Sequence, residues 1–132
     1  MAKYVYPAVF TREENGLYSV VFPDLESCYT CGNNLEDAIA MAEDVLAFTL
    51  FDYEKENKKI PSPSLSSEIS INKDEFVNFI RCDTIEYQKR TNTKAVRKTL
   101  SIPEWLNTAA EKAGINFSQI LQEALKLKLG VA

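Results

Sequence analysis

The last forty residues constrain the fold most, because they predict one strand, two short helices and no second strand for the first to pair with. Residues 95–102 alternate between apolar and polar side chains, so one face of this strand would be buried and the other open. Pro103 ends the strand and suits the first turn of the helix that follows. A lone strand leaves unpaired edges, and so short a segment rarely buries a sufficient core. We therefore predict a symmetric dimer in which the two strands pair antiparallel.

The polar face of this predicted strand carries Arg97, Thr99 and Ser101. Paired strands would present these residues twice on one surface, and a two-stranded ribbon fits the major groove of DNA. Arg97 can donate two hydrogen bonds to guanine, and the hydroxyls of Thr99 and Ser101 can contact several bases. A solvated strand face is the alternative, but the strand has no other sheet to join. We therefore expect these side chains to contact DNA bases.

The second predicted helix begins at Asn116 or Ser118, where free backbone N–H groups and the positive end of the helix dipole favour an anion. An ordinary N-cap is the other interpretation, and the two are compatible. Lys94 and Lys98 are expected to make nonspecific contacts with the DNA backbone, although Lys98 could instead lie over the dimer core. A two-fold dimer predicts a palindromic DNA site. The apolar residues expected to build the dimer core are Trp105, Leu106, Ala109, Ala110, Ala113, Ile115, Phe117, Ile120, Leu121, Ala124, Leu125 and Leu127.

The first ninety residues predict a sheet covered by one long helix. Asn34 is a good N-cap for this helix, whose apolar spacing continues over Leu35–Glu56, and Pro61 prevents its extension. Asp83 is expected to cap a short helix that runs through Arg90. The resulting order, β-β-β-α-β, is that of an α+β domain with a helix on a mostly antiparallel sheet. Its strands are expected at Lys3–Thr11, Leu17–Phe22, Cys28–Cys31 and Glu75–Cys82.

Net charge also divides the chain. The total of −4 combines −8 over residues 1–83 with +4 over residues 84–132. Opposite signs favour a basic partner for the first part and an anionic partner for the second, and chance scatter of charge is the alternative. The hydrophobic content of 45% is that of a globular protein.

Cysteine usage and hydropathy bound the compartment. Cys28, Cys31 and Cys82 are odd in number, which argues against a closed disulfide framework and for a reducing environment. The first residues lack a basic stretch followed by an apolar core, and the longest apolar stretches are far shorter than a membrane span. We expect a cytoplasmic protein that does not contact a membrane.

The residues that catalysis or metal binding would need are missing. The sequence has no histidine, and a structural zinc site would need two ligands beyond Cys28 and Cys31, of which only Cys82 remains. Cys28 and Cys31 would face opposite sides of a strand, which favours a structural role for both. The acids of residues 13–26 gather near turns, and the first strand holds no carboxylate. We therefore expect no enzyme activity, no metal and no cofactor.

Several stretches resemble a known family. The sequences YPAVF at 6–10, GLYSVVFPDLESCYTCGNNLEDAIAMAEDVL at 16–46 and IPSPS at 60–64 look like the N-terminal domain of HicB antitoxins. The sequence TKAVRKTLSIPEWL at 93–106 continues the likeness into a C-terminal ribbon-helix-helix domain. Its most specific part is F-P-D-L with the turn, helix and P-S-P that follow, although Glu26-Ser27 stand where the family often has Pro-Gly.

HicB proteins pair with HicA, a small basic RNA-binding toxin that cuts messenger RNA. The resemblance implies that residues 1–90 form a toxin-binding domain with a degenerate RNase H-like fold and that residues 91–94 are a linker. It implies that residues 95–132 form a ribbon-helix-helix domain that dimerises, binds operator DNA and represses the operon of the chain itself. The DNA phosphate contacts implied are Lys94, Asn116 and Ser118, and the toxin contacts expected are Tyr18, Asp24, Leu25, Glu26 and Tyr29.

Two other functions remain to be weighed. A freestanding ribbon-helix-helix regulator would keep the DNA-binding domain and use the N-terminal half to sense a small molecule, and a gene for a basic toxin next door would decide against it. An enzyme is the third possibility, and the missing catalytic residues count against it. Whether dimers pair further through their N-terminal domains is left open.

Overall fold

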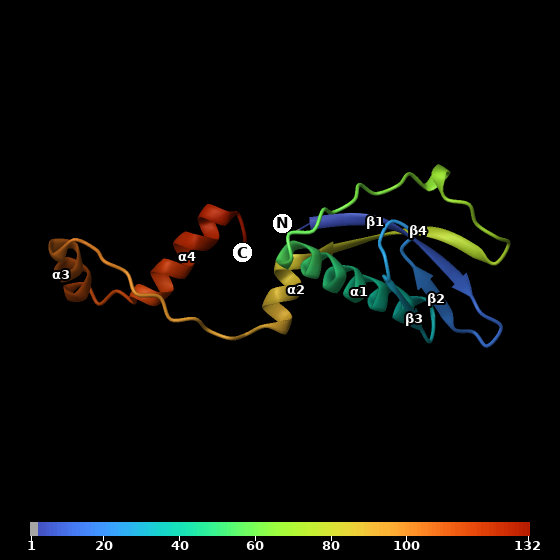
Figure 1. Cartoon of the computed structure of the whole chain (residues 1–132). Coiled ribbons are helices and arrows are strands. Elements are labelled where there is room, and N and C mark those ends of the chain that lie inside the picture. Colours follow the sequence, from blue (N-terminus) through green and yellow to red (C-terminus); the bar gives the residue numbers. More distant parts are fainter. Residues whose placement is uncertain (1–2) are drawn as a thin grey trace. The chain divides into compact units, whose positions relative to one another are not determined.

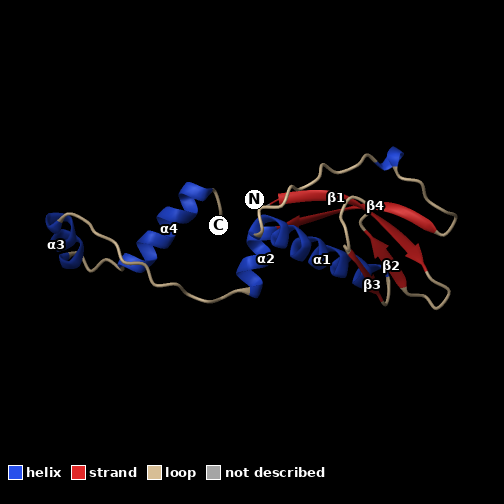
Figure 2. Cartoon of the chain, in the orientation of Figure 1, coloured by secondary structure: helices blue, strands red, loops and turns tan. Residues whose placement is uncertain are grey.

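A computed structural model describes residues 3–132 and divides the chain into two compact units, one ending at Lys94 and the other beginning at Ala95. Over these residues the fold is α+β, with a four-stranded antiparallel sheet and four α-helices, as the sequence predicts (Figures 1 and 2). The elements are β1 (Lys3–Arg12), β2 (Tyr18–Val21), β3 (Tyr29–Gly32), α1 (Leu35–Lys55), the 3-10 turn η1 (Ser66–Glu68), β4 (Glu75–Asp83), α2 (Thr84–Thr91), α3 (Glu104–Lys112) and α4 (Phe117–Leu129).

The sheet of the N-terminal unit has the order β3-β2-β1-β4, and every neighbouring pair is antiparallel. The hairpin between β1 and β2 turns at Asn15-Gly16, and Gly16 has a φ of 86° that a side chain would strain. The long pairing of β1 with β4 runs from Lys3 opposite Asp83 to Thr11 opposite Glu75. The pairing thereby places the first and last strands of the sheet, which are far apart in the sequence, next to each other.

Helix α1 lies across one face of this sheet (Figure 2). Asn34 caps it as predicted, because its Oδ1 accepts a hydrogen bond from the Asp37 N–H at 2.9 Å. Asp37 in turn accepts one from the Asn33 N–H at 2.9 Å. Gly32 lets the helix approach closely, since a Cβ there would lie 2.3 Å from the backbone N of Ala38. The core between helix and sheet is apolar and is built from Tyr6, Ala8, Phe10, Val20, Phe22, Leu25, Cys28, Ala38, Ala42, Leu46, Leu50 and Ile80.

The segment after α1 has no regular structure except η1, and two hydrogen-bonded contacts fix it. The Tyr6 hydroxyl donates to the carbonyl oxygen of Pro61. The Asp24 carboxylate accepts from both the backbone N–H and the hydroxyl of Ser64. Ile60, which directly precedes Pro61, packs against the core. The P-S-P stretch therefore helps to close the core, whereas α1 already ends at Lys55, just before Asn57 with its φ of 56°.

Helix α2 is held against α1. Asp83 caps α2 as predicted, with Oδ1 accepting from the N–H groups of Ile85 at 2.9 Å and Glu86 at 3.3 Å. Arg90 reaches Asp44 of α1 at 2.8 Å, which adds a charged contact between the two helices. The helix runs to Thr91, which was expected to begin the linker, so the irregular stretch starts at Asn92.

The C-terminal unit differs from expectation in its first segment. The described residues 95–102 form no strand, because a strand is defined by hydrogen bonds to a partner strand and the single chain offers none. The two helices form where predicted, joined by a turn in which Gly114 has a φ of 69°. Pro103 occupies the N-cap of α3 instead of its first turn. Within residues 95–132, all of them described, no side chain is fully buried.

Candidate functional site

The predicted DNA-contacting segment is open on both sides in the single chain. Arg97, Thr99 and Ser101 are exposed. The apolar side chains that alternate with them are exposed too, and Val96 is 83% exposed. A segment that leaves both its polar and its apolar side chains in water lacks the contact that would bury the apolar side.

The helices behind this segment carry further exposed apolar surface. Trp105 is 71% exposed and Leu127 is 84% exposed. Apolar area of this extent on so small a unit marks an interaction surface, because burying it is worth roughly 25 cal/mol per Å². The other large apolar side chains exposed here are Leu100, Ile102, Leu106, Ile115, Phe117, Ile120, Leu125 and Leu129.

The start of α4 has the geometry of a capped helix N-terminus. Asn116 Oδ1 accepts from the Gln119 N–H at 3.1 Å, which satisfies one free donor of the first turn. The Ser118 hydroxyl accepts from the amide of Gln122 at 3.1 Å and remains exposed. Lys94, the last residue before the C-terminal unit, has an exposed side chain as well. All three residues predicted to contact phosphate are therefore accessible to solvent.

The N-terminal unit carries a long stretch without positive charge. Between Arg12 and Lys55 the sequence has no lysine or arginine, yet it has ten aspartates and glutamates. This stretch includes almost all of α1, where Glu36, Glu43 and Asp44 are exposed. The negative potential of the unit is thus concentrated on one run of the chain.

The register of the sheet separates two of the predicted toxin contacts. Tyr18 pairs with Gly32, and Tyr29 pairs with Val21. Because side chains alternate along a strand, Tyr18 and Tyr29 lie on opposite faces of the sheet. Tyr18 is half-buried and meets the ring of Phe76 edge-on at 6.5 Å, whereas Tyr29 is 67% exposed.

The loop after β2 holds the other three predicted contacts in different environments. Asp24 is half-buried and bonded to Ser64. Leu25 is only 5% exposed and belongs to the core, so its side chain offers no surface to a partner. Glu26 is exposed, and Ser27 has a φ of 57° at the tip of the loop. The position of Leu25 is set by packing in the core.

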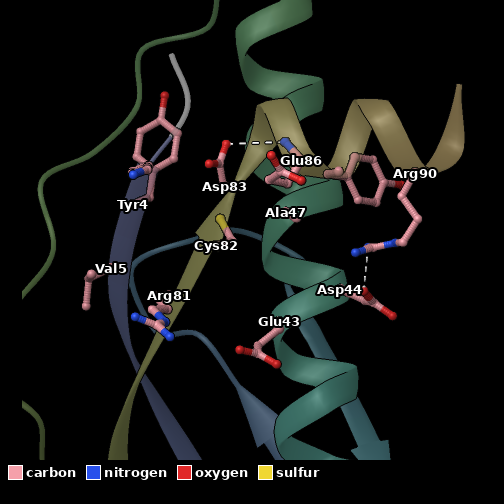
Figure 3. Close-up of a pocket in the computed structure, with 12 residues that line it drawn as sticks. Tyr4, Val5, Glu43, Asp44, Ala47, Arg81, Cys82, Asp83, Glu86 and Arg90 are labelled. Atoms are coloured by element: carbon pink, nitrogen blue, oxygen red, sulfur yellow. Dashed lines mark hydrogen bonds and ion pairs between the residues drawn. The ribbon is translucent and has the colours of Figure 1, made fainter. Parts of the chain in front are cut away.

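A cavity of about 550 Å³ opens between the ends of β1 and β4 and the helices α1 and α2 (Figure 3). Three of its charged groups are paired, since Asp44 binds Arg90 at 2.8 Å and Glu86 binds Lys89 at 3.2 Å. Asp83 is occupied as the cap of α2. The cavity lies where the two helices meet the sheet. Among residues 3–132, no cluster of three or more metal-binding side chains exists, and no helix is long and apolar enough to cross a membrane.

The three cysteines are free, and their environments differ. Cys28 is buried and lies one residue before β3, although the strand was expected to begin there, whereas Cys31 is exposed within β3. Burial raises the pKa of Cys28, whose sulfur accepts a hydrogen bond from the Thr49 hydroxyl at 3.4 Å. Burial, followed by the charge of Glu54, raises the pKa of Cys82 to about 12. Cys28 and Cys82 are therefore protonated packing residues at neutral pH, which does not suit redox chemistry.

Comparison with known proteins gives a consistent result. A family model described as the HicB-like antitoxin of bacterial toxin–antitoxin systems matches residues 6–125. "Antitoxin HicB 2" of Photorhabdus laumondii is 42% identical over 64 residues, which are 48% of this chain and 45% of that protein. The matched part thus spans less than half the length of this relative.

Solved structures are similar over more of the chain. One from a toxin–antitoxin complex of Streptococcus pneumoniae has a TM-score of 0.62 at 27% identity and covers 96% of this chain and 99% of that one. A chain from the HicA3 and HicB3 toxin–antitoxin complex has a TM-score of 0.50 at 22% identity, with coverage of 61% and 99%. The second likeness concerns the fold alone.

Proposed function

The chain belongs to the HicB-like antitoxin family of bacterial toxin–antitoxin systems, and from this premise we propose that its N-terminal unit binds and neutralises a HicA-type toxin. Such a toxin, as the resemblance implies, is basic because it binds RNA. A basic surface that attracts RNA also attracts a folded surface of negative charge, and the two would compete for it. Occupying that surface would keep the toxin from its RNA.

The observation that carries this proposal is the run from Glu13 to Glu54, with ten acids and no basic residue. Of the toxin contacts expected from sequence, Glu26 and Tyr29 are exposed and remain proposed contacts. Asp24 and Tyr18 are half-buried and already in contact with other side chains. We therefore propose that they hold the loop and the hairpin in the conformation that the toxin binds. The sheet and α1 are proposed to be a degenerate RNase H-like core without nuclease activity, in keeping with a β1 that holds no carboxylate.

We propose a separate role for the C-terminal unit. Residues 95–102 of two copies would pair antiparallel, which would supply the missing ladder partner and cover Val96 and the apolar helices. The resulting ribbon-helix-helix dimer would direct Arg97, Thr99 and Ser101 to bases, with Lys94, Asn116 and Ser118 on phosphates. A two-fold dimer reads a palindromic operator, and binding at its own promoter would repress the operon.

The test is to co-express the chain with the toxin encoded beside it, purify the pair and determine the mass of the complex. A stable complex in which RNA cleavage by the toxin is suppressed is the expected result. If the two proteins separate on purification while the chain still binds operator DNA, the neutralisation proposal fails and the freestanding-regulator alternative takes its place. If the chain binds the toxin but binds no DNA, the proposed repressor function fails instead.

A further inference from the structure

Strand β4 forms one edge of the sheet, and its outer side has no partner strand within residues 3–132. Its inner side pairs with β1 in one continuous register, in which Thr11 lies opposite Glu75. One step further along, the Arg12 N–H donates to the Asp74 carbonyl oxygen at 3.2 Å. Backbone groups alternate in direction along a strand. The even-numbered residues of β4 therefore turn their backbone groups to β1, and the odd-numbered residues turn theirs outward.

The outward backbone groups of Val77, Phe79 and Arg81 have no backbone hydrogen-bond partner among the described residues. Natural edge strands are usually protected against pairing by a proline, a bulge or a short length. All residues of β4 are described, and this strand has nine residues, no proline and an unbroken register. Strand β3, at the other edge, has only four residues. The edge of β4 is therefore suited to pairing with a further strand.

The sequence of β4 is self-complementary about Asn78. Glu75 and Arg81 lie three residues to either side of Asn78 and carry opposite charges, and the apolar Val77 and Phe79 lie one residue to either side. Two antiparallel copies with a two-fold axis at Asn78 would place Glu75 opposite Arg81 and Val77 opposite Phe79, each pair twice. All four residues are odd-numbered, so their outward backbone groups would supply the hydrogen bonds of the new ladder.

We propose that β4 pairs antiparallel with β4 of a second copy of this chain, with Asn78 at the two-fold axis. Opposite charges and apolar pairs stabilise neighbouring strands, whereas like charges directly opposite destabilise them. A shift of the axis to Phe79 would place Glu75 opposite Asp83, and a shift to Val77 would place Phe79 opposite Glu75. The amide of Asn78 carries both a donor and an acceptor, so it can bond to its own copy across the axis. The two sheets would join into one sheet of eight strands.

The side chains that the pairing needs are available. Arg81 is exposed, has no ion pair within the described part of the chain and lies on the side of β4 away from α1 (Figure 3). The Glu75 carboxylate is held in place by the N–H of Asn72 at 2.8 Å and by the Thr11 hydroxyl at 3.3 Å, but the described residues give it no cation. Phe79 is 50% exposed, so a second strand would cover apolar surface that one chain leaves in water.

This contact is independent of the C-terminal unit and of toxin binding. If two chains also pair through residues 95–102 as proposed, each chain has two self-pairing elements. Pairing through β4 would then join two such dimers into a tetramer. Linked units pair more tightly than separate ones, because the second contact forms within one assembly.

The experiment measures the mass of full-length variants by light scattering over a dilution series, with a thermal melt of each. Arg81→Glu and Glu75→Arg each place like charges opposite one another twice, and the double variant restores the pair with its signs exchanged. Glu68→Arg is the control for Glu75, since the Glu68 carboxylate also accepts an N–H from three residues earlier at 2.8 Å. Arg12→Glu is the control for Arg81, because Arg12 is an exposed arginine at the end of β1.

The wild type, the double variant and both controls should share one mass. Each single edge variant should fall to half of that mass at the same concentration, with a dissociation constant about tenfold higher or more. Equal masses for the wild type and the single variants would overturn the proposal. A double variant that folds but stays dissociated would also overturn it, because the charges would then not meet in this register. If the masses are equal but the edge variants lose affinity for the toxin, β4 pairs with the toxin and the self-pairing proposal fails.

Discussion

The carboxylate of Asp24 accepts two hydrogen bonds from Ser64, one from its backbone N–H at 3.0 Å and one from its hydroxyl. The two residues are forty positions apart and belong to the loops that follow β2 and α1. This pair joins the F-P-D-L turn to the P-S-P stretch, which are the two most specific motifs of the N-terminal half. Both motifs thus have a structural reason that is independent of any partner.

We expect Asp24→Ala to lower the free energy of unfolding by about 2 kcal/mol, because a charged acceptor of two bonds is lost. Ser64→Ala should cost about 1 kcal/mol, since its backbone N–H still donates. Urea unfolding of the full chain measures both. The exposed neighbour Glu26→Ala serves as control and should stay within about 0.5 kcal/mol of the wild type. Equal effects for all three variants would mean that the pair does not hold the loops together.

Gly32→Ala should be the most damaging single substitution in the N-terminal unit. The added Cβ would lie 2.3 Å from the backbone N and 2.5 Å from the Cα of Ala38, and backbone atoms cannot move aside cheaply. A loss above about 4 kcal/mol, or failure to fold, is expected. Gly114→Ala is the comparison, because its φ of 69° is strained for alanine but the space around it is open, so a loss of about 1–2 kcal/mol should follow. Thermal melts that rank the two variants the other way would contradict the close packing of α1.

Arg97→Ala should weaken binding to the operator about tenfold or more while toxin binding is retained, because its guanidinium is proposed to contact a base and the toxin contacts are proposed in the other unit. Lys94→Ala should instead weaken binding to all DNA sequences alike and reduce the salt dependence, as a phosphate contact does. Gel shifts with operator and unrelated DNA at two salt concentrations separate these outcomes. Unchanged operator affinity in Arg97→Ala would show that the ribbon does not recognise the DNA bases through Arg97.

Stability should fall at alkaline pH through Cys82. Its pKa is raised from 9.0 to about 12, first by burial and next by Glu54, so between these values the folded state keeps a proton that the unfolded chain releases. The stability that this thiol contributes is therefore complete below pH 9.0 and is lost as the pH rises towards 12. Urea unfolding at pH 8 and pH 10.5 should show a smaller decline for Cys82→Ala than for the wild type. Parallel declines would assign the alkaline loss to the buried tyrosines instead.

The sequence predicted the elements of the N-terminal unit well because their signals are local. Asn34 and Asp83 are caps whose side chains bond to N–H groups two or three residues further on, so the residue type alone marks the helix start. The sequence could not predict that Tyr18 and Tyr29 lie on opposite faces of the sheet, because this depends on how β3 pairs with β2. The burial of Leu25 likewise depends on a core assembled from distant segments.

The segment 95–102 shows a different limit. Its alternation predicts a strand with one apolar side, yet the single chain forms no strand there, because the pattern specifies a surface and says nothing about the partner. The sequence of one chain can thus specify a strand whose hydrogen-bonding partner must come from another molecule.

The unpaired state of residues 95–102 has a consequence for regulation if the ribbon forms between two copies. The element that reads DNA would then be absent from any one molecule and would come into being only when two meet. Repressor activity would follow the square of antitoxin concentration at low levels, so a fall in supply would release the promoter abruptly. Toxin binding, proposed for the N-terminal unit, needs only one molecule and would decline in proportion, which lets the promoter reopen while the toxin is still held.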